Sequence, residues 1–263
     1  MRADDEAPPP EKIAALRTLL EGSESIVGFT GAGISTAAGI PDFRSPGGMW
    51  TKMEPVTYQE FVASEAARIE DWRRRFVMND QFAAARPTVA HMALAAMADS
   101  GRMPAIVTQN IDGLHQRSGV GSERVIELHG NATYGHCIDC RRRMELDEVR
   151  SFVEAEKRSP KCRTCGGLVK AAVISFGEAM PEAAMREAAR HCMDADLILV
   201  VGTSLVVHPA ASLPVLGLQH GAGIVIINRE STPLDHDVEL VLNHSSDSVF
   251  AAAFPQIAVA NRI

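Results

Sequence analysis

Four short apolar runs in this chain each end in a cluster of glycines and small polar residues. The runs are residues 25–29, 105–107, 197–201 and 224–227. Continuous apolar runs of this length are typical of strands that are buried on both faces, as in a parallel sheet. Because ligands of open α/β sheets bind beyond the carboxyl ends of the strands, the four polar clusters predict one shared nucleotide site.

Helical periodicity between these runs predicts that strands alternate with helices. Helices are expected over residues 11–21, 57–85, 88–100, 181–191 and 209–220, and further strands over 125–128, 169–176 and 238–242. This alternation is typical of a doubly wound parallel sheet, a Rossmann-like α/β fold. A Gly/Pro-rich loop at residues 41–55 is long enough to be a lid or a binding loop.

The cysteines are spaced as in a zinc site. Cys137 and Cys140 form one C-x-x-C pair, and Cys162 and Cys165 form another after 21 intervening residues, in which a helix is expected over 145–157. Four thiolates complete a closed tetrahedral Zn²⁺ site, which would be structural rather than catalytic. The alternative is four unrelated buried thiols, and Cys192 is expected to be a plain buried thiol.

These patterns together predict the domain organisation. The nucleotide-binding domain comprises residues 11–45, 86–135 and 170–263. A smaller inserted domain comprises a helical part, 46–85, and a zinc-ribbon part, 136–169. Residues 1–10, with three acidic residues and three prolines, are expected to be a disordered lead-in.

Composition and charge exclude several classes of protein. The chain has 263 residues, 46% of them hydrophobic, which suffices for a sizeable core, and its formal charge of −7 argues against broad nucleic-acid binding. No run reaches the ~18 apolar residues that span a bilayer. The first residues resemble neither a signal peptide nor a transit peptide, so a cytoplasmic location is expected.

Gly31-Ala32-Gly33 follows the first apolar run and would let the backbone approach a pyrophosphate. The pair of glycines alone is a weak signal and fits a bare strand–helix turn as well. The third glycine of the usual dinucleotide fingerprint is missing, since Thr36 stands there, and no acidic residue ends a second strand ~20 residues on. A standard NAD dehydrogenase is therefore disfavoured.

A longer set of motifs resembles the sirtuins, the NAD-dependent protein deacylases. Residues 31–44, GAGISTAAGIPDFR, are similar to the family's first signature, and further blocks follow in family order: TQNIDGLH at 108–115, ELHGN at 127–131, FGE at 176–178, GTSL at 202–205 and INRE at 227–230. The two cysteine pairs lie where the family carries its zinc ribbon. The resemblance covers residue 26 to the C-terminus and suggests a bacterial member of the family.

The resemblance implies that NAD is cleaved at the nicotinamide glycosidic bond and that the acyl group of a lysine migrates to the ribose, giving O-acyl-ADP-ribose. It implies that His129 is the base that accepts a proton from the ribose hydroxyls, a role that suits an imidazole near neutral pH. Asn110 and Asp112 would hold the nicotinamide amide and the ribose in a reactive pose. The implied cofactors are NAD and structural zinc, and the partners are acyl-lysine peptides or proteins, without nucleic acid or membrane.

The resemblance also assigns binding residues. Those for NAD are Gly31, Ala32, Gly33, Ile34, Asp42, Phe43, Arg44, Gln109, Asn110, Ile111, Asp112, Gly202, Thr203, Ser204, Asn228, Arg229, Glu230 and Ser246. Phe43 would shield the anomeric centre from water, and Ser246, near the adenine, is as easily a plain surface serine. The two edges that would receive the peptide as an added strand are Ser175, Phe176, Gly177 and Glu178 on one side and Val206 and Val207 on the other.

Two departures from the family pattern bear on the substrate. Sirtuins often carry Arg-Pro and a polar residue before FGE, whereas Lys170-Ala171 stand here and Ser175 replaces a frequent aromatic residue. Sirtuins that prefer succinyl or malonyl groups carry Tyr-x-x-Arg, whereas residues 70–76 contain Arg73, Arg74 and Arg75 without a tyrosine. An acetyl or another neutral acyl group is therefore favoured.

Two other functions stay open at this point. Mono-ADP-ribosyl transfer uses the same cleavage of NAD with a different acceptor, and a non-catalytic NAD-sensing interaction module would bind NAD alone. Retention of His129 favours deacylation, and a non-catalytic module would be expected to lose Asn110, Asp112 or His129. His91 and His115 are expected to be structural, and His136 is discounted as a fifth metal ligand.

Overall fold

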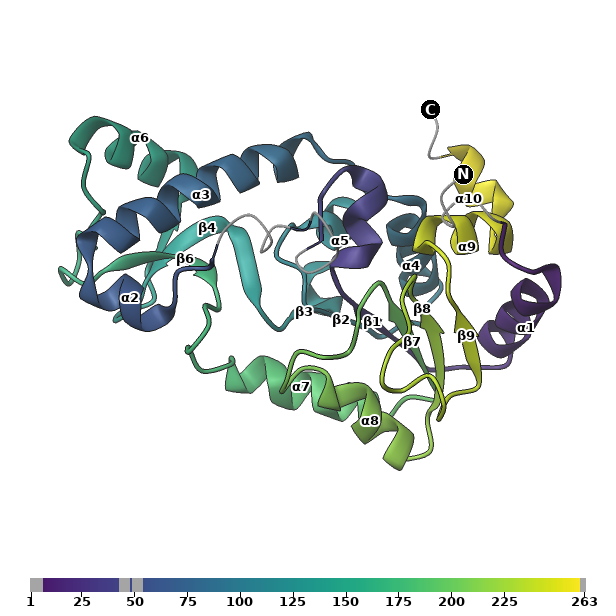
Figure 1. Ribbon diagram of the computed structural model, residues 1–263. Helices are drawn as coiled ribbons and strands as arrows, with labels where there is room; N and C mark the ends of the chain where they lie inside the picture. Colours follow the sequence, from purple (N-terminus) through teal and green to yellow (C-terminus); the bar gives the residue numbers. More distant parts are fainter. Residues whose placement is uncertain (1–6, 43–47, 49–53, 261–263) are drawn as a thin grey trace.

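A computed structural model describes residues 7–42, 48 and 54–260. Its larger sheet has six parallel strands in the order β3-β2-β1-β7-β8-β9 (Figure 1). The strands are β1 (Ile26–Thr30), β2 (Ala105–Thr108), β3 (Val125–Glu127), β7 (Leu197–Val201), β8 (Gly223–Ile227) and β9 (Leu240–Leu242). The four apolar runs are thus β1, β2, β7 and β8. The chain builds outward from β1 to β3 and then crosses to β7, so the strand order reverses between β1 and β7, where such sheets bind ligands.

Helices cover both faces of this sheet. One face carries α1 (Pro10–Glu21), α4 (Val89–Asp99), α9 (Ser246–Ala253) and α10 (Pro255–Ala260), and the other carries α7 (Glu182–Met193) and α8 (Ser212–Gln219) (Figure 1). Alternate strand residues enter the two cores: Leu199 packs with the first set of helices, and Ile198 and Val200 pack with the second. This two-sided burial explains the continuous apolar runs.

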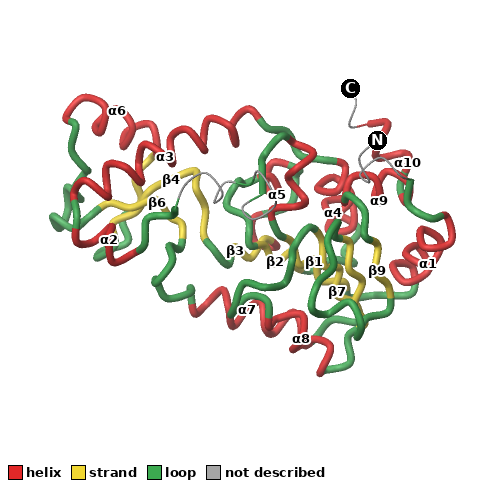
Figure 2. Tube along the Cα trace, viewed as in Figure 1, coloured by secondary structure: helices red, strands yellow, loops and turns green. Residues whose placement is uncertain are grey.

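A second sheet of three antiparallel strands has the order β5-β4-β6 and forms a smaller domain. Its strands are β4 (Gly130–Cys137), β5 (Arg143–Glu145) and β6 (Val169–Val173), and its helices are α2 (Tyr58–Ala63), α3 (Glu65–Ala84) and α6 (Leu146–Glu156). Trp72, Phe76, Val149 and Val169 share its core. Figure 2 shows this domain beside the larger one, joined to it through β4. The predicted doubly wound parallel sheet with a smaller inserted domain is confirmed.

The elements differ in detail from the prediction. The single helix expected over 57–85 is broken at Ser64, whose extended backbone and side chain cap α3 through Ala67 N. The strand expected over 169–176 ends at Val173, and both β4 and β6 pair in the smaller sheet, although residues 130–135 and 170–173 were assigned to the nucleotide-binding domain. The described residues also form three short helices: η2 (Ala32–Ala38), α5 (Leu114–Arg117) and η4 (Ser122–Arg124). Within the described ranges, no helix has the length and apolar character needed to span a membrane.

Candidate active site

The turns after β1 and β7 lie in direct backbone contact. Gly31 N donates to Val201 O at 3.0 Å, and Gly33 N donates to Gly202 O at 2.8 Å. A Cβ atom on Gly33 would lie 2.7 Å from Gly202 Cα, and Gly202 has a φ of +63°, which side chains disfavour. The glycines therefore let the two turns pack backbone against backbone, which holds the end of β1 against the end of β7.

Asn110 and Asp112, after β2, are almost completely buried at 6% and 5% exposure. The Asn110 amide donates to Gly31 O at 3.2 Å, which ties the end of β2 to the end of β1. Asp112 accepts hydrogen bonds from Ser35 Oγ at 2.7 Å and from Leu114 N at 2.9 Å. Burial raises the pKa of Asp112, and these hydrogen bonds oppose the shift. Both side chains are held rigidly, as positioning of a bound nucleotide requires.

His129 lies beside this cluster. Its Nδ1 is 3.0 Å from the carbonyl oxygen of Gln109, and the Gln109 side chain donates to Thr203 Oγ1 at 3.0 Å. A carbonyl oxygen only accepts, so Nδ1 is the donor in this contact. The structure thus brings together residues from the ends of β1, β2, β3 and β7, all of which the sequence predicted at one site.

Sequence reasoning missed several residues that support this cluster. Ser35 bonds both Asp112 and the Asn110 amide, which lies 3.3 Å from its hydroxyl. Below them, Thr30 Oγ1 lies 2.8 Å from both Thr108 Oγ1 and His115 Nε2, and Thr108 Oγ1 accepts from Asn110 N at 3.0 Å. The sequence signal that could have identified these supporting residues is their position in, or next to, the polar clusters at the strand ends.

Glu127 is another supporting residue that the prediction left out. Its Oε1 accepts hydrogen bonds from the amides of Asn131 at 2.7 Å and Gln116 at 2.8 Å. Burial raises its pKa, and the two amides oppose that shift. This arrangement joins the segments on either side of His129 to α5 and thereby fixes the backbone that carries the histidine.

The residues assigned to the adenosine end are less enclosed. Arg229 and Glu230 are exposed, and the Asn228 amide donates to Glu230 O at 2.8 Å. Ser204, beyond the end of β7, is half-buried, and Ser246 is buried at 5% exposure as the first residue of α9. Ser246 is therefore not a surface serine. Asp42 is half-buried at the edge of the described chain, and the predictions for Phe43 and Arg44 lie outside the described residues.

The four cysteines of the ribbon form one cluster. The sulfur atoms of Cys137, Cys140, Cys162 and Cys165 all lie within 4.8 Å of one another. Zn–S bonds of about 2.3 Å place tetrahedral sulfur ligands about 3.8 Å apart. The Cys137–Cys165 and Cys140–Cys162 distances are 3.4 and 3.6 Å, so the cluster fits Zn²⁺. Cys137 ends β4, eight residues after the candidate base His129, or at most about 26 Å away at ~3.3 Å per residue. Zinc there would be structural.

The segments assigned to the peptide present exposed apolar side chains. Phe176 is 45% exposed and Val206 is 50% exposed, which is unusual for large apolar residues of this chain. Ile174 N donates to His129 O at 2.9 Å, so the first segment starts directly beside the candidate base. Exposed apolar side chains next to a polar cluster are typical of a peptide-binding surface.

Comparison with known proteins shows which proteins this chain is similar to. The Sir2 family profile matches residues 31–209. An NAD-dependent protein deacetylase of Rhodopseudomonas palustris is 50% identical over 232 residues, which cover 88% of this chain and 92% of that protein. NAD-dependent protein deacetylase 1 of Bradyrhizobium diazoefficiens is 49% identical over 232 residues, which cover 88% and 91%. A solved structure of a Sir2 with a p53 peptide and NAD⁺ matches with a TM-score of 0.85 at 34% identity, covering 94% of this chain and 99% of that chain.

Proposed function

Since the chain belongs to the Sir2 family, we propose that it is an NAD-dependent protein-lysine deacetylase. The substrates are NAD and an acyl-lysine peptide or protein. The products are nicotinamide, the free lysine and O-acyl-ADP-ribose. The structural cofactor is one zinc ion on the four clustered cysteines.

The observation that carries this proposal is the position of His129 and the contact that orients its ring. Its Nδ1–H is engaged by Gln109 O, at the residue that precedes the buried Asn110. We assign the role of general base to Nε2, the other ring nitrogen. An imidazole suits this task because its ordinary pKa lies near neutral pH.

The other residues of the cluster hold the co-substrate. The two packed glycine turns, at Gly31–Gly33 and at Gly202, face the pyrophosphate, and Gln109 with Thr203 lies beside the ribose. Asn110 and Asp112, held by Gly31 O and Ser35, fix the nicotinamide and ribose end. NAD supplies a ribose carbon that becomes electrophilic as nicotinamide leaves. Buried side chains around it limit the access of water.

The arginines of α3 support a preference for a neutral acyl group. Arg74 pairs with Glu70 at 2.7 Å, and the half-buried Arg75 pairs with Asp71 at 3.3 Å. The indole N–H of Trp72 is engaged by Val169 O at 3.3 Å. Because Arg74 and Arg75 are each paired with a carboxylate and Arg73 is exposed, an acidic acyl group would bring an uncompensated carboxylate into the site. Acetyl-lysine is therefore the favoured substrate.

The test is to incubate the protein with NAD and a panel of acyl-lysine peptides and to follow the products by mass spectrometry. Nicotinamide together with O-acyl-ADP-ribose and free lysine supports the proposal. ADP-ribosylated peptide without deacylation would show a transferase, and no nicotinamide release would show a non-catalytic module. We place the activity in the cytoplasm, because four zinc-binding thiolates need a reducing compartment.

A further inference from the structure

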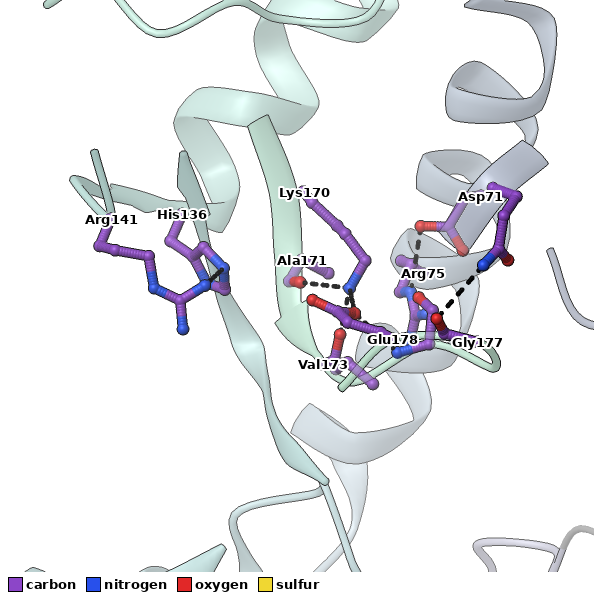
Figure 3. Close-up of polar contacts among 11 residues, drawn as sticks. Asp71, Arg75, His136, Arg141, Lys170, Ala171, Val173, Gly177 and Glu178 are labelled. Atoms are coloured by element: carbon purple, nitrogen blue, oxygen red, sulfur yellow. Dashed lines mark hydrogen bonds and ion pairs between the residues drawn. The ribbon is translucent and has the colours of Figure 1, made fainter. Parts of the chain in front are cut away.

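Lys170 is a completely buried lysine on β6. Its side chain has 0% exposure, and its ammonium group lies 2.9 Å from Glu178 Oε2, 3.5 Å from Ala171 O and within hydrogen-bond distance of Val173 O (Figure 3). Burial lowers the pKa of Lys170, and Glu178 opposes this shift. A buried ammonium is costly unless it is paired and fully hydrogen-bonded. Here each of its three protons has an oxygen within reach, which fixes the side chain in one place.

The partner of Lys170 closes a turn in the segment assigned to the peptide. The same Oε2 of Glu178 accepts a hydrogen bond from Ser175 N at 2.9 Å, and Glu178 N donates to Ser175 O at 3.0 Å. Between them, Gly177 has a φ of +80°. A backbone hydrogen bond therefore closes the four-residue turn, the Glu178 carboxylate holds its first residue, and Lys170 pairs with that carboxylate.

The turn is also tied to the candidate base and to α2. Ile174 N donates to His129 O at 2.9 Å, and Tyr58 N donates to Phe176 O at 2.9 Å. The Gln59 amide donates to Gly177 O at 3.3 Å. The ring of Phe176, in the middle of this turn, is exposed on its outer face. The turn is thus the rigid connection between His129 and the surface that would receive the peptide.

A second buried ion pair lies next to the first. Arg75 and Asp71 of α3 pair at 3.3 Å with 12% and 8% of their side chains exposed, close to Glu178 and Gly177 (Figure 3). Arg75 lowers and Asp71 raises the pKa of Lys170, so the four charges interact. With Arg75 occupied by Asp71, Glu178 has Lys170 as its cation. Arg75 is therefore not a substitute for the lysine.

We propose that Lys170 is a positioning residue for the acyl-lysine peptide, acting through Glu178 on the backbone of Ser175–Glu178. The inference rests on the proposed function, because it concerns the affinity for that substrate. Loss of the Lys170 ammonium removes the ion pair that holds the Glu178 carboxylate and lets the turn move. The peptide then loses its preformed edge, whereas the NAD cluster at the ends of β1, β2 and β7 has no contact with Lys170 in the described structure.

Steady-state kinetics of the full chain test this separation. In Lys170→Met, which keeps the length of the side chain, the KM for an acetyl-lysine peptide is expected to rise at least about tenfold. The KM for NAD and kcat at saturating peptide are expected to stay within about threefold. Lys170→Arg keeps the charge and the donors and is expected to bring the peptide KM back to within about threefold of the original.

Glu178→Gln and Asp80→Asn complete the set. Glu178→Gln retains an oxygen for Ser175 N but removes the charge, and it is expected to raise the peptide KM as well, so it decides the matter if Lys170→Met does not fold. Asp80→Asn breaks the 2.6 Å ion pair with Arg150 between α3 and α6 in the same domain. It serves as the control and is expected to leave the peptide KM unchanged.

Three outcomes would overturn the inference. A folded Lys170→Met or Glu178→Gln protein with a lower melting temperature and an unchanged peptide KM would show a purely structural role. An equal rise in both KM values, or a loss confined to kcat, would place the effect on NAD or on the chemical step. These results are distinct from failure of the proposed function, which would appear as an unmodified chain without NAD-dependent deacetylation.

Discussion

The hydroxyl of Ser35 donates a 2.7 Å hydrogen bond to Oδ2 of Asp112 and so connects the segments that follow β1 and β2. Replacing Ser35 by alanine leaves a buried carboxylate oxygen without its donor, at a cost of about 1–3 kcal/mol. We expect Ser35→Ala to lower kcat/KM for deacetylation by about tenfold or more, with similar loss of nicotinamide exchange. Ser100→Ala removes a hydroxyl that only caps α4 and is the control. Equal activity of both variants would contradict a role for the Ser35–Asp112 contact.

The proposed role of His129 predicts that its replacement affects deacetylation more than nicotinamide exchange. His129→Ala or His129→Tyr is expected to lower the rate of deacetylation by about 10²–10⁴-fold, the usual contribution of a general base. The fold and zinc content should stay intact, and nicotinamide exchange, an earlier step, should partly survive. His220→Ala, at an exposed position after α8, is the control. A folded His129 variant that deacetylates at the original rate would refute the assignment.

The cysteine cluster predicts about one zinc per chain by elemental analysis. Replacing Cys140 by serine should lower the zinc content and the melting temperature of the smaller domain, because formation of such a site is coupled to folding. Cys192→Ala removes a buried thiol outside the cluster and should retain the metal. Full stability after complete removal of the zinc would contradict a structural role.

The pairing of Arg75 with Asp71 predicts the choice of acyl group. On one peptide, kcat/KM for acetyl-lysine should exceed that for succinyl-lysine by at least about tenfold, or ~1.4 kcal/mol. Asp71→Asn leaves Arg75 without its carboxylate and should reduce this ratio, whereas Asp80→Asn should not. Equal efficiencies for both acyl groups in the unmodified chain would reveal an anion site elsewhere.

The buried imidazoles of His91 and His115 predict a loss of stability in acid. Their ring centroids are 4.8 Å apart, and His91 Nε2 and His115 Nδ1 have no hydrogen-bond partner in the described structure. Burial lowers the pKa of His115 to about 4 and that of His91 well below its ordinary value, and His115 lowers the pKa of His91 further. The unfolded chain therefore binds more protons, and the free energy of unfolding falls as the pH drops below about 6.5.

For His115 this loss is complete near pH 4, and each group contributes up to about 1.4 kcal/mol per pH unit. Denaturant unfolding at pH 7.5 and pH 5 would measure it. His115→Gln should flatten the dependence, and His220→Ala should leave it unchanged. The raised pKa values of Asp112 and Glu127 act in the opposite sense, so the comparison is between each variant and the original chain. An unaltered slope in a folded His115→Gln protein would contradict the prediction.

The larger sheet could be predicted because its signals are local. An apolar run followed by a polar cluster marks both the strand and its ligand end, and Asn110 and Asp112 could be placed from these runs, whereas the role of His129 was implied by the resemblance to the sirtuins. β4 was missed because its sequence, GNATYGHC, has two glycines and no regular alternation of apolar and polar residues. Its pairing with β6 depends on residues more than 30 positions away. Lys170 gives no local signal either, because a lysine within an apolar run shows nothing of where its ammonium lies or that Glu178 is its partner.

β4 begins one residue after His129 and ends at a thiolate ligand of the cysteine cluster. Two of the four cysteines, Cys140 and Cys165, are exposed residues, whereas Cys137 and Cys162 are buried. Oxidants in solution would therefore reach Cys140 and Cys165 first. Because β4 connects the cysteine cluster to His129, loss of order at the cluster would also loosen the backbone at the histidine. We expect peroxide to inactivate the protein in step with release of its metal, without any chemical change at the histidine. The catalytic rate of this enzyme would then depend on the oxidation state of a cluster that takes no part in the reaction.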